Sequence, residues 1–288
     1  MISLIRALRP QQWTKNFFVF AGIIFALKFF DGPLLLTVLA AFVIFCCLSS
    51  AIYLINDIHD LDGDRQHPVK CLRPIAAGQL GVPSALGTAL ILALIGLSGA
   101  LALGAAFFLT ALTYFVLMIL YTFVLRDLVI LDTFTIAAGF VLRAIAGVVV
   151  ITVQLSPWLV ICTILLSLFI ALGKRRHELV TLGNGTHRRI LDEYNPELLD
   201  QMISAVAGGT VMAYALYTLW PETIAKFGTH NLVYTVPFVL YGIFRYLYLI
   251  YHEEKGGRPE ELLVTDGPLF IDILLWIMTL LLIIYRFK

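Results

Sequence analysis

The chain has 288 residues, of which 60% are hydrophobic and only 14% are charged, and its mean hydropathy is +0.92. Soluble domains average about 45–50% apolar and about 25% charged residues, so this composition excludes a water-soluble globule. The formal net charge of +1 says little by itself, and we expect an integral membrane protein with no nucleic-acid partner.

Apolar runs between helix breakers predict about nine transmembrane helices. A bilayer core about 30 Å thick requires about 20 apolar residues per helix. Gly104 alone separates the third helix from the fourth, because about 40 residues in one helix would extend to about 60 Å. In chain order the predicted helices cover 16–30, 34–55, 83–103, 105–125, 128–150, 158–173, 201–220, 231–251 and 269–286.

Positive charge predicts the orientation of these helices, because cytoplasmic loops retain Lys and Arg. Of the 20 such residues, fourteen fall in the N-terminus and the second, fourth, sixth and eighth loops, against four on the opposite side. We expect a plasma (inner) membrane protein with a cytoplasmic N-terminus, and an odd number of helices then places the C-terminus outside. The fourteen are Arg6, Arg9, Lys15, Arg65, Lys70, Arg73, Arg126, Lys174, Arg175, Arg176, Arg188, Arg189, Lys255 and Arg258.

An acidic cluster, N-D-I-H-D-L-D-G-D over residues 56–64, stands at the expected cytoplasmic end of the second helix. At about 100° per residue, Asp57, Asp60 and Asp64 share one face of a continuing helix, and Asn56 adjoins Asp60. Converging carboxylates repel one another, and hard divalent cations relieve that repulsion. Mg²⁺ is usually held by one or two carboxylates together with waters and substrate phosphates. The cluster therefore predicts a magnesium–diphosphate site.

Other interpretations of the cluster fit less well. A solvated helix end balanced by nearby cations would explain one carboxylate, but not three on one face beside hydrocarbon. Zinc is disfavoured because His59 projects off that face and no other His or Cys lies at ligand spacing. Asp62 points away and is expected to be solvated.

Basic residues near the ends of the first, second and sixth helices are candidate phosphate ligands. The segment 173–179 contains three consecutive cations, Lys174, Arg175 and Arg176, and one carboxylate, Glu178. Such a group of cations favours binding of phosphate over binding of a metal ion. For Lys70, Lys174 and Arg175 we prefer phosphate binding to a positive-inside anchor. The anchor role is preferred for Arg6, Arg9, Arg126, Arg188, Arg189, Lys255 and Arg258.

Ionisable residues within the helices are functional candidates, because each costs at least about 2.5–3.5 kcal/mol near the bilayer centre. Arg143 lies among small residues that would let a helix or a ligand approach. The sequence leaves two roles open for it, a phosphate contact and an interhelical bond. For Asp132 and Arg245 we expect structural roles. Tyr121, near the end of the fourth helix, fits either a diphosphate contact or an interfacial aromatic belt.

The acidic motif resembles N-D-x-x-D-x-x-x-D, the signature of the UbiA superfamily of intramembrane prenyltransferases, and nine helices is that family's fold. The resemblance covers essentially the whole chain. It implies one all-α transmembrane domain over 1–288, around a central cavity that opens to the cytoplasmic side and the membrane. It also implies that Asp57, Asp60 and Asp64 are catalytic Mg²⁺ ligands for a diphosphate leaving group, with Asn56 beside them, and it is compatible with a homo-oligomer.

Three segments narrow the resemblance within the superfamily: R-P-Q-Q-W-T-K-N over 9–16, D-R-Q-H-P-V-K-C-L-R-P-I-A-A-G over 64–78 and L-G-K-R-R-H-E-L over 172–179. They look most like the branch that transfers the 5-phosphoribosyl group from phosphoribosyl diphosphate to a polyprenyl (decaprenyl) phosphate. Two positions depart from the pattern, Glu178 in a segment that is usually aspartate-rich and Cys71 where a basic residue is expected. The implied substrate-binding residues are Lys15, Asn56, Arg65, Lys70, Arg73, Tyr121, Arg143, Lys174, Arg175 and Glu178.

Two alternative functions remain open on the sequence. A polyprenyltransferase with an aromatic or glycerol-phosphate acceptor would use the same carboxylates, although it has fewer phosphates to bind than the cations suggest. A transporter or lipid-binding membrane protein would use the acidic motif as a cation site and would release no diphosphate.

Overall fold

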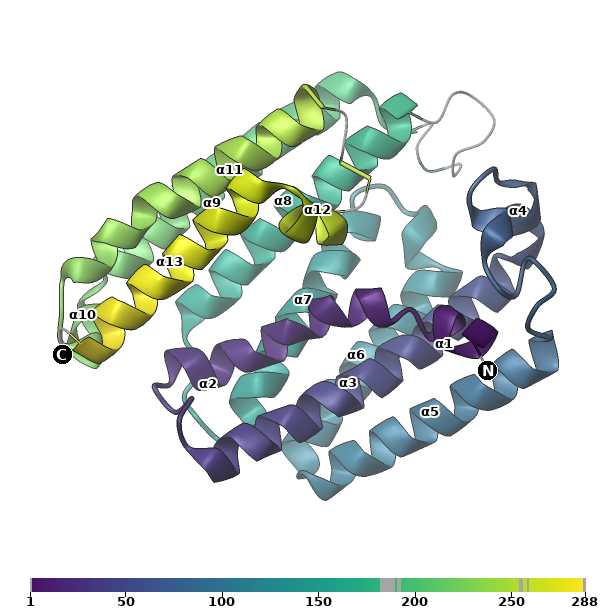
Figure 1. Ribbon diagram of the computed structural model, residues 1–288, viewed down its shortest axis with the longest axis horizontal. Helices are drawn as coiled ribbons and strands as arrows, with labels where there is room; N and C mark the ends of the chain where they lie inside the picture. Colours follow the sequence, from purple (N-terminus) through teal and green to yellow (C-terminus); the bar gives the residue numbers. More distant parts are fainter. Residues whose placement is uncertain (1, 182–189, 191–192, 254–255, 258, 287–288) are drawn as a thin grey trace. The chain divides into compact units, whose positions relative to one another are not determined.

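The computed structural model describes residues 2–181, 190, 193–253, 256–257 and 259–286. Their regular elements are all helical, and by contacts the chain forms two compact units, Met1–Ser156 and Pro157–Lys288 (Figure 1). Eight described helices are long and apolar enough to cross a membrane. The expected all-α membrane architecture is thereby confirmed, while the single domain over 1–288 stays a prediction.

The first unit contains the acidic motif and seven α-helices. Its elements are α1 (Ile2–Leu8), η1 (Pro10–Phe20), α2 (Ala21–Phe25), α3 (Gly32–His59), α4 (Leu61–Gln66), η2 (Lys70–Leu72), α5 (Val82–Ala102), α6 (Ala105–Phe123), η3 (Leu125–Asp127) and α7 (Leu131–Val150). At 1.5 Å per residue α3 is about 42 Å long, which exceeds a bilayer core of about 30 Å. The excess length allows the acidic end of α3 to reach the membrane–water interface.

Among its described residues, the second unit has three long helices, a fourth extended by a 3₁₀ turn, and two short ones. Its elements are α8 (Pro157–Thr181), α9 (Pro196–Leu219), α10 (Pro221–Phe227), η5 (Asn231–Thr235), α11 (Val236–Tyr251), α12 (Pro259–Thr265) and α13 (Gly267–Arg286). Four cations counted for orientation, Arg188, Arg189, Lys255 and Arg258, lie outside the described residues.

Two of the long helices begin where a side chain satisfies a free backbone N–H group. Asp31 caps α3 by accepting from the N–H of Leu34 at 3.2 Å, and Asn195 caps α9 by accepting from Leu198 at 2.7 Å. Between α5 and α6, Gly104 adopts φ 122° and ψ 154°, a region essentially restricted to glycine. The break predicted at Gly104 is confirmed.

The first predicted helix, 16–30, is not a regular helix in the structure. Its residues fall in η1, in α2 and in the turns over 26–30, so the count of nine spans is not confirmed. Runs of 3₁₀ helix beyond 3–4 residues are uncommon, and tertiary hydrogen bonds support this one. The indole of Trp13 donates to Ser50 Oγ at 3.0 Å, and the buried Asn16 amide donates to Ser49 Oγ at 3.3 Å. These polar contacts fasten η1 to α3.

The sixth predicted helix is longer than expected. The sequence predicts it over 158–173, but α8 continues to Thr181, so Lys174, Arg175 and Glu178 lie on a helix instead of in a loop. Helical spacing makes residues three and four apart neighbours. This places Glu178 next to both cations.

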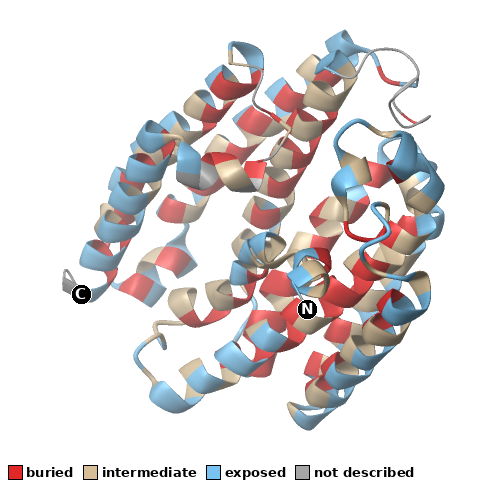
Figure 2. Ribbon diagram, turned by 45° about the vertical axis from the view of Figure 1, so that its right-hand side comes forward, coloured by how far each residue is buried: buried red, intermediate tan, exposed pale blue. Residues whose placement is uncertain are grey.

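Each unit has its own buried apolar core (Figure 2). In the first unit η1, α2 and α7 pack so closely that a Cβ atom on Gly22 would lie 2.7 Å from the carbonyl carbon of Gly147. The small residues predicted around Arg143 therefore admit a neighbouring segment.

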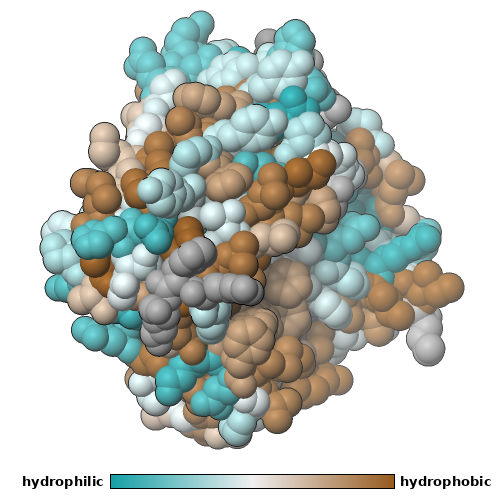
Figure 3. Space-filling model, turned by 60° about the vertical axis from the view of Figure 1, so that its left-hand side comes forward, coloured by the Kyte–Doolittle hydropathy of each residue, from teal (hydrophilic) through white to brown (hydrophobic). Residues whose placement is uncertain are grey.

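Outer helix faces carry exposed apolar residues such as Leu90 and Leu94 of α5, and Figure 3 shows broad hydrophobic areas on the visible face. Such faces suit contact with lipid.

Candidate functional site

The acidic motif spans the junction of α3 and α4. The helix is interrupted at Asp60, yet the N–H of Asp60 donates to the carbonyl of Asn56 at 2.9 Å and that of Asp64 to Asp60 at 2.8 Å. The four-residue hydrogen-bond spacing of an α-helix therefore persists across the junction. As a result, residues four apart remain on neighbouring turns.

Asp57 and Asp64 are joined by one guanidinium group. Arg73 donates from one nitrogen to Asp57 Oδ1 at 3.1 Å and to Asp64 Oδ2 at 2.6 Å, and Arg9 also donates to Asp57 Oδ1. The side chains of Asp57 and Asp64 are only 2% and 4% exposed. Because both carboxylates are buried, loss of either ion pair would strongly destabilise the protein by leaving a buried charge unpaired.

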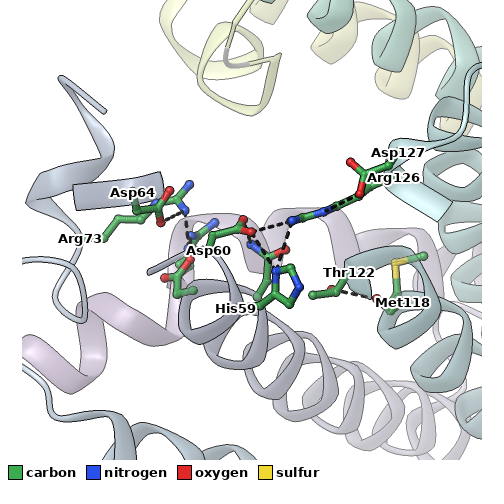
Figure 4. A network of polar contacts seen from close by, with 11 residues as sticks. His59, Asp60, Asp64, Arg73, Met118, Thr122, Arg126 and Asp127 are labelled. Carbon is green, nitrogen blue, oxygen red and sulfur yellow. Dashed lines mark hydrogen bonds and ion pairs between the residues drawn. The ribbon is translucent and has the colours of Figure 1, made fainter. Parts of the chain in front are cut away.

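Asp60 has a separate set of partners (Figure 4). Its Oδ1 accepts from Arg126 at 2.6 Å and lies 3.2 Å from His59 Nδ1, while its Oδ2 accepts from the Asn56 amide at 3.1 Å. The expectation that His59 leaves this face is wrong, because its ring lies beside Asp60 and Arg126. Asp62, by contrast, is 95% exposed as expected and pairs only loosely with Arg65, at 3.8 Å.

Two buried atoms of this network have no hydrogen-bond partner: Asp57 Oδ2, an acceptor, and Arg126 Nε, a donor. Native proteins rarely leave buried polar atoms unsatisfied, and such atoms often mark a functional site. An unused acceptor suits a cation and an unused donor suits an anion. The network thus keeps one buried acceptor for a cation and one buried donor, 4.0 Å from the exposed Asp127 carboxylate, for an anion.

The donor set fits a hard divalent cation. Asp57, Asp60, Asp64 and Asn56 offer oxygen atoms, which Mg²⁺ prefers, and Asp57 Oδ2 has no protein donor. No group of three His, Cys, Asp and Glu side chains in the described part of the chain stands in a metal-holding arrangement. Instead, guanidinium groups form ion pairs with the carboxylates, so binding of a metal ion would require these groups to move.

The other predicted residues of the first unit lie in η1, α4, η2 and α6. Lys15 is half-buried in η1, Lys70 is half-buried in η2, and Tyr121 is half-buried in the last turn of α6. Arg65 is 56% exposed and faces Asp62. Their roles in binding substrate stay predictions.

Arg143 is only 5% exposed, and its three guanidinium nitrogens donate to η1, to α6 and to the preceding turn of its own helix. It donates to Asn16 Oδ1 at 2.8 Å, to the Gly139 carbonyl at 2.9 Å and to the Tyr114 hydroxyl at 2.7 Å. The guanidinium also lies 4.6 Å from the centre of the Tyr114 ring. Of the two roles weighed for Arg143, this geometry favours the bond between helical segments.

An Arg143→Met variant is expected to lose stability and to keep its affinity for ligands. The substitution leaves the buried Asn16 and Tyr114 oxygens without a donor, at about 1–3 kcal/mol for each unsatisfied group. Thermal unfolding in detergent should therefore occur at a lower temperature, while Mn²⁺ and diphosphate titrations remain unchanged. A loss of diphosphate affinity without loss of stability would instead assign Arg143 to the substrate.

Lys174, Arg175 and Glu178 come together on α8, within the second unit. Arg175 is 3% exposed and donates to Glu178 Oε2 at 2.6 Å, and Lys174 Nζ lies 4.0 Å from Glu178 Oε1. Next to them, Arg176 pairs with Asp200 at 2.5 Å and lies over the ring of Tyr251. Glu178 thus balances the cations of its own helix turn.

Arg245 and Asp132, for which the sequence predicts structural roles, have surroundings consistent with such roles. Arg245 donates two hydrogen bonds to Asp266, at 3.0 and 2.7 Å, and lies 3.9 Å from Glu253. Asp132 is fully buried near the start of α7.

Sequence reasoning missed Arg9 and Arg126 as partners of the carboxylates. It assigned both to the positive-inside anchor, but Arg9 contacts Asp57, 48 positions along the chain, and Arg126 contacts Asp60, 66 positions away. Neither distance follows from helical spacing. The R-P-Q-Q-W-T-K-N segment, singled out for its resemblance, was the one signal that included Arg9.

Comparison with known proteins agrees with this geometry. The sequence profile of the UbiA prenyltransferase family matches residues 16–265. The chain is 35% identical to decaprenyl-phosphate phosphoribosyltransferase of Corynebacterium glutamicum, over 98% of this chain and 87% of that protein. It is 34% identical to the protein of that name from Mycolicibacterium smegmatis, over 96% and 91%. A solved UbiA homologue from Archaeoglobus fulgidus bound to GPP and Mg²⁺ has the same fold, with a TM-score of 0.74, 19% identity and coverage of 98% and 99%.

Proposed function

The chain belongs to the UbiA prenyltransferase family, and from this premise we propose that it is a phosphoribosyltransferase. It transfers the 5-phosphoribosyl group of phosphoribosyl diphosphate to a polyprenyl phosphate and releases diphosphate. The observation that carries the proposal is the set of three carboxylates interleaved with three guanidinium groups at the end of α3. Carboxylates suit a metal ion and guanidinium groups suit phosphate, and relatives of almost the same length have the corresponding name.

Asp57, Asp60 and Asp64 would hold the divalent ion, for which we propose Mg²⁺, the ion bound in the Archaeoglobus homologue. When bound, such an ion neutralises charge that develops on a departing diphosphate. Asn56 fixes the Asp60 carboxylate through its amide, so that its oxygens stay oriented.

The guanidinium groups would stabilise the phosphate oxygens. Arg73 can donate two parallel hydrogen bonds, a geometry that matches phosphate. As the C1–O bond of the donor breaks, charge grows on the diphosphate and C1 becomes cationic, and donors positioned at that charge lower the barrier. The acceptor phosphate is already anionic near neutral pH, so its attack on C1 needs no general base.

We further propose that Lys15, Lys70, Tyr121, Lys174 and Arg175 contribute to binding the substrate phosphates. The segregation of fourteen cations supports a cytoplasmic N-terminus in the plasma membrane, where a soluble sugar phosphate is accessible. The remaining proposals are a single domain over 1–288 and a homo-oligomer, which rest on family resemblance, and an external C-terminus, which rests on an odd number of membrane-spanning helices.

The proposal is tested by supplying the purified protein with each donor in turn. With Mg²⁺, phosphoribosyl diphosphate and a polyprenyl phosphate, we expect diphosphate release and a phosphoribosylated lipid in the mass spectrum. Chelation of the metal should abolish both. Turnover of a prenyl diphosphate with an aromatic or glycerol-phosphate acceptor, and none with phosphoribosyl diphosphate, would contradict the proposal and establish the alternative transferase.

A further inference from the structure

The guanidinium groups that hold the acidic motif come from connecting segments. Arg9 lies between α1 and η1 with a left-handed backbone, φ 53°, and Arg126 lies in the short η3 between α6 and α7. Left-handed φ is uncommon for a residue other than glycine, and the strain it carries is often found at switch regions. Both side chains can therefore change partners without displacement of a long helix.

The network balances charge but does not satisfy every polar atom. Asp57 and Asp60 each accept from arginine through Oδ1, while Asp57 Oδ2 has no donor. Arg126 donates through NH1 to Asp60 and through NH2 toward His59, while its Nε makes no hydrogen bond and lies 4.0 Å from the exposed Asp127 carboxylate. Arg126 is only 13% exposed, so water does not easily provide the missing partner.

We infer that Arg9 and Arg126 act as exchangeable counter-ions. They neutralise Asp57 and Asp60 while no metal ion is bound, and they transfer to phosphate oxygens of the substrate when a divalent cation takes the carboxylates. The inference rests on the proposed function for the nature of that substrate. It gives two residues that the sequence assigned to membrane anchoring a direct part in ligand binding.

Electrostatics explains why the exchange would link the two ligands. A metal ion that binds alone must displace a guanidinium group from its buried carboxylate partner, and among the described residues Arg126 then keeps only the exposed Asp127 carboxylate at 4.0 Å. Loss of such a pairing in a partly buried position is costly. A phosphate that binds alone must take the guanidinium from a buried carboxylate, at similar cost. When both ligands bind, each displaced charge has a new partner. Metal and phosphate should therefore each raise the affinity for the other.

In Arg126→Gln and Arg9→Gln variants, the exchange predicts higher affinity for the metal ion and lower affinity for the phosphate ligand. Without a competing guanidinium, Mn²⁺ in the absence of substrate should bind about tenfold more tightly than to the unmodified protein, since loss of a partly buried ion pair is of this order. Inorganic diphosphate or farnesyl phosphate, titrated into the Mn²⁺-loaded protein, should bind about tenfold more weakly. The two anions distinguish the leaving group from the lipid phosphate as the new partner.

The measurements are Mn²⁺ titrations by electron paramagnetic resonance and anion titrations by calorimetry, on the full chain in detergent. Arg6→Gln is the matched control, because Arg6 is exposed on α1, and it should change neither affinity. Arg126→Lys keeps the charge but loses the planar guanidinium group, so its affinity for diphosphate should lie between those of Arg126→Gln and the unmodified protein. The same variant replaces Arg126→Gln in the test if the glutamine variant does not fold.

Unchanged or weaker Mn²⁺ binding in both variants would overturn the counter-ion role. Tighter Mn²⁺ binding with unchanged affinity for both anions would overturn the transfer to phosphate. Neither titration uses phosphoribosyl diphosphate, so an enzyme that uses a prenyl diphosphate would give the same expected results. Failure of the proposed function is thus distinguishable from failure of the exchange.

Discussion

Replacing Asp57 with Asn should reduce magnesium-dependent diphosphate release by about a hundredfold to a thousandfold, the usual cost of removing one group that stabilises transition-state charge. Asp57 is the most buried carboxylate of the site, accepts from both Arg9 and Arg73, and has one oxygen without a hydrogen-bond donor. Asparagine preserves the shape but supplies only one, neutral oxygen. Steady-state release of diphosphate at saturating donor measures the effect.

Asp62→Asn is the matched control for this variant. Asp62 belongs to the same motif, but its side chain is 95% exposed, so activity should remain within about twofold, as expected for a surface substitution. Circular dichroism and thermal unfolding of both variants separate loss of chemistry from loss of fold. Full activity of the Asp57 variant in a folded protein would exclude Asp57 as a ligand of the metal.

A Gly147→Ala substitution should destabilise the first unit by about 3 kcal/mol, at the upper end of the range for overpacking. A Cβ at this position would overlap with the carbonyl oxygen of Val19 in η1, and on the other helical segment Gly22 faces the Gly147 backbone. Both sides of the contact are main chain, so no side-chain rotation relieves the overlap. The free energy of unfolding in detergent, from thermal or denaturant titration, should fall accordingly.

Gly87→Ala is the control for the close approach. Gly87 lies within α5, where an added Cβ would meet nothing within 4 Å. Because alanine is favoured over glycine inside a helix by about 0.5–1 kcal/mol, this variant should be slightly more stable. Equal stability of the Gly147 and Gly87 variants would show that the η1–α7 approach tolerates a methyl group.

The sequence predicted the regular helices well because each depends on local apolar length and on breakers. The second predicted helix, 34–55, corresponds to α3, and the main-chain angles of Gly104 confirm the predicted break between α5 and α6. The first predicted helix failed because its form depends on contacts made later in the chain, such as the hydrogen bond from Trp13 to Ser50. The continuation of α8 beyond residue 173 was missed because hydropathy ends where the cations begin, while helical structure does not.

The acidic half of the site was predictable because its members lie within nine residues and helical spacing brings them together. Its basic half was only partly predictable. Arg73 was expected near the cluster, whereas Arg9 and Arg126 join it by tertiary packing over 48 and 66 positions. Arg143 was open to two roles because a buried arginine has the same sequence signature whether it contacts a ligand or, as here, Asn16 and Tyr114.

The connection between α5 and α6 bears on how the protein is assembled in the membrane. It consists of Leu103 and Gly104 alone, and two extended residues reach only about 7 Å. A tether of this length cannot cross a hydrocarbon layer about 30 Å thick, so neither helix can span the layer while the other remains behind. During synthesis, α5 and α6 must therefore pass from the translocation machinery into the lipid together, as one helical hairpin.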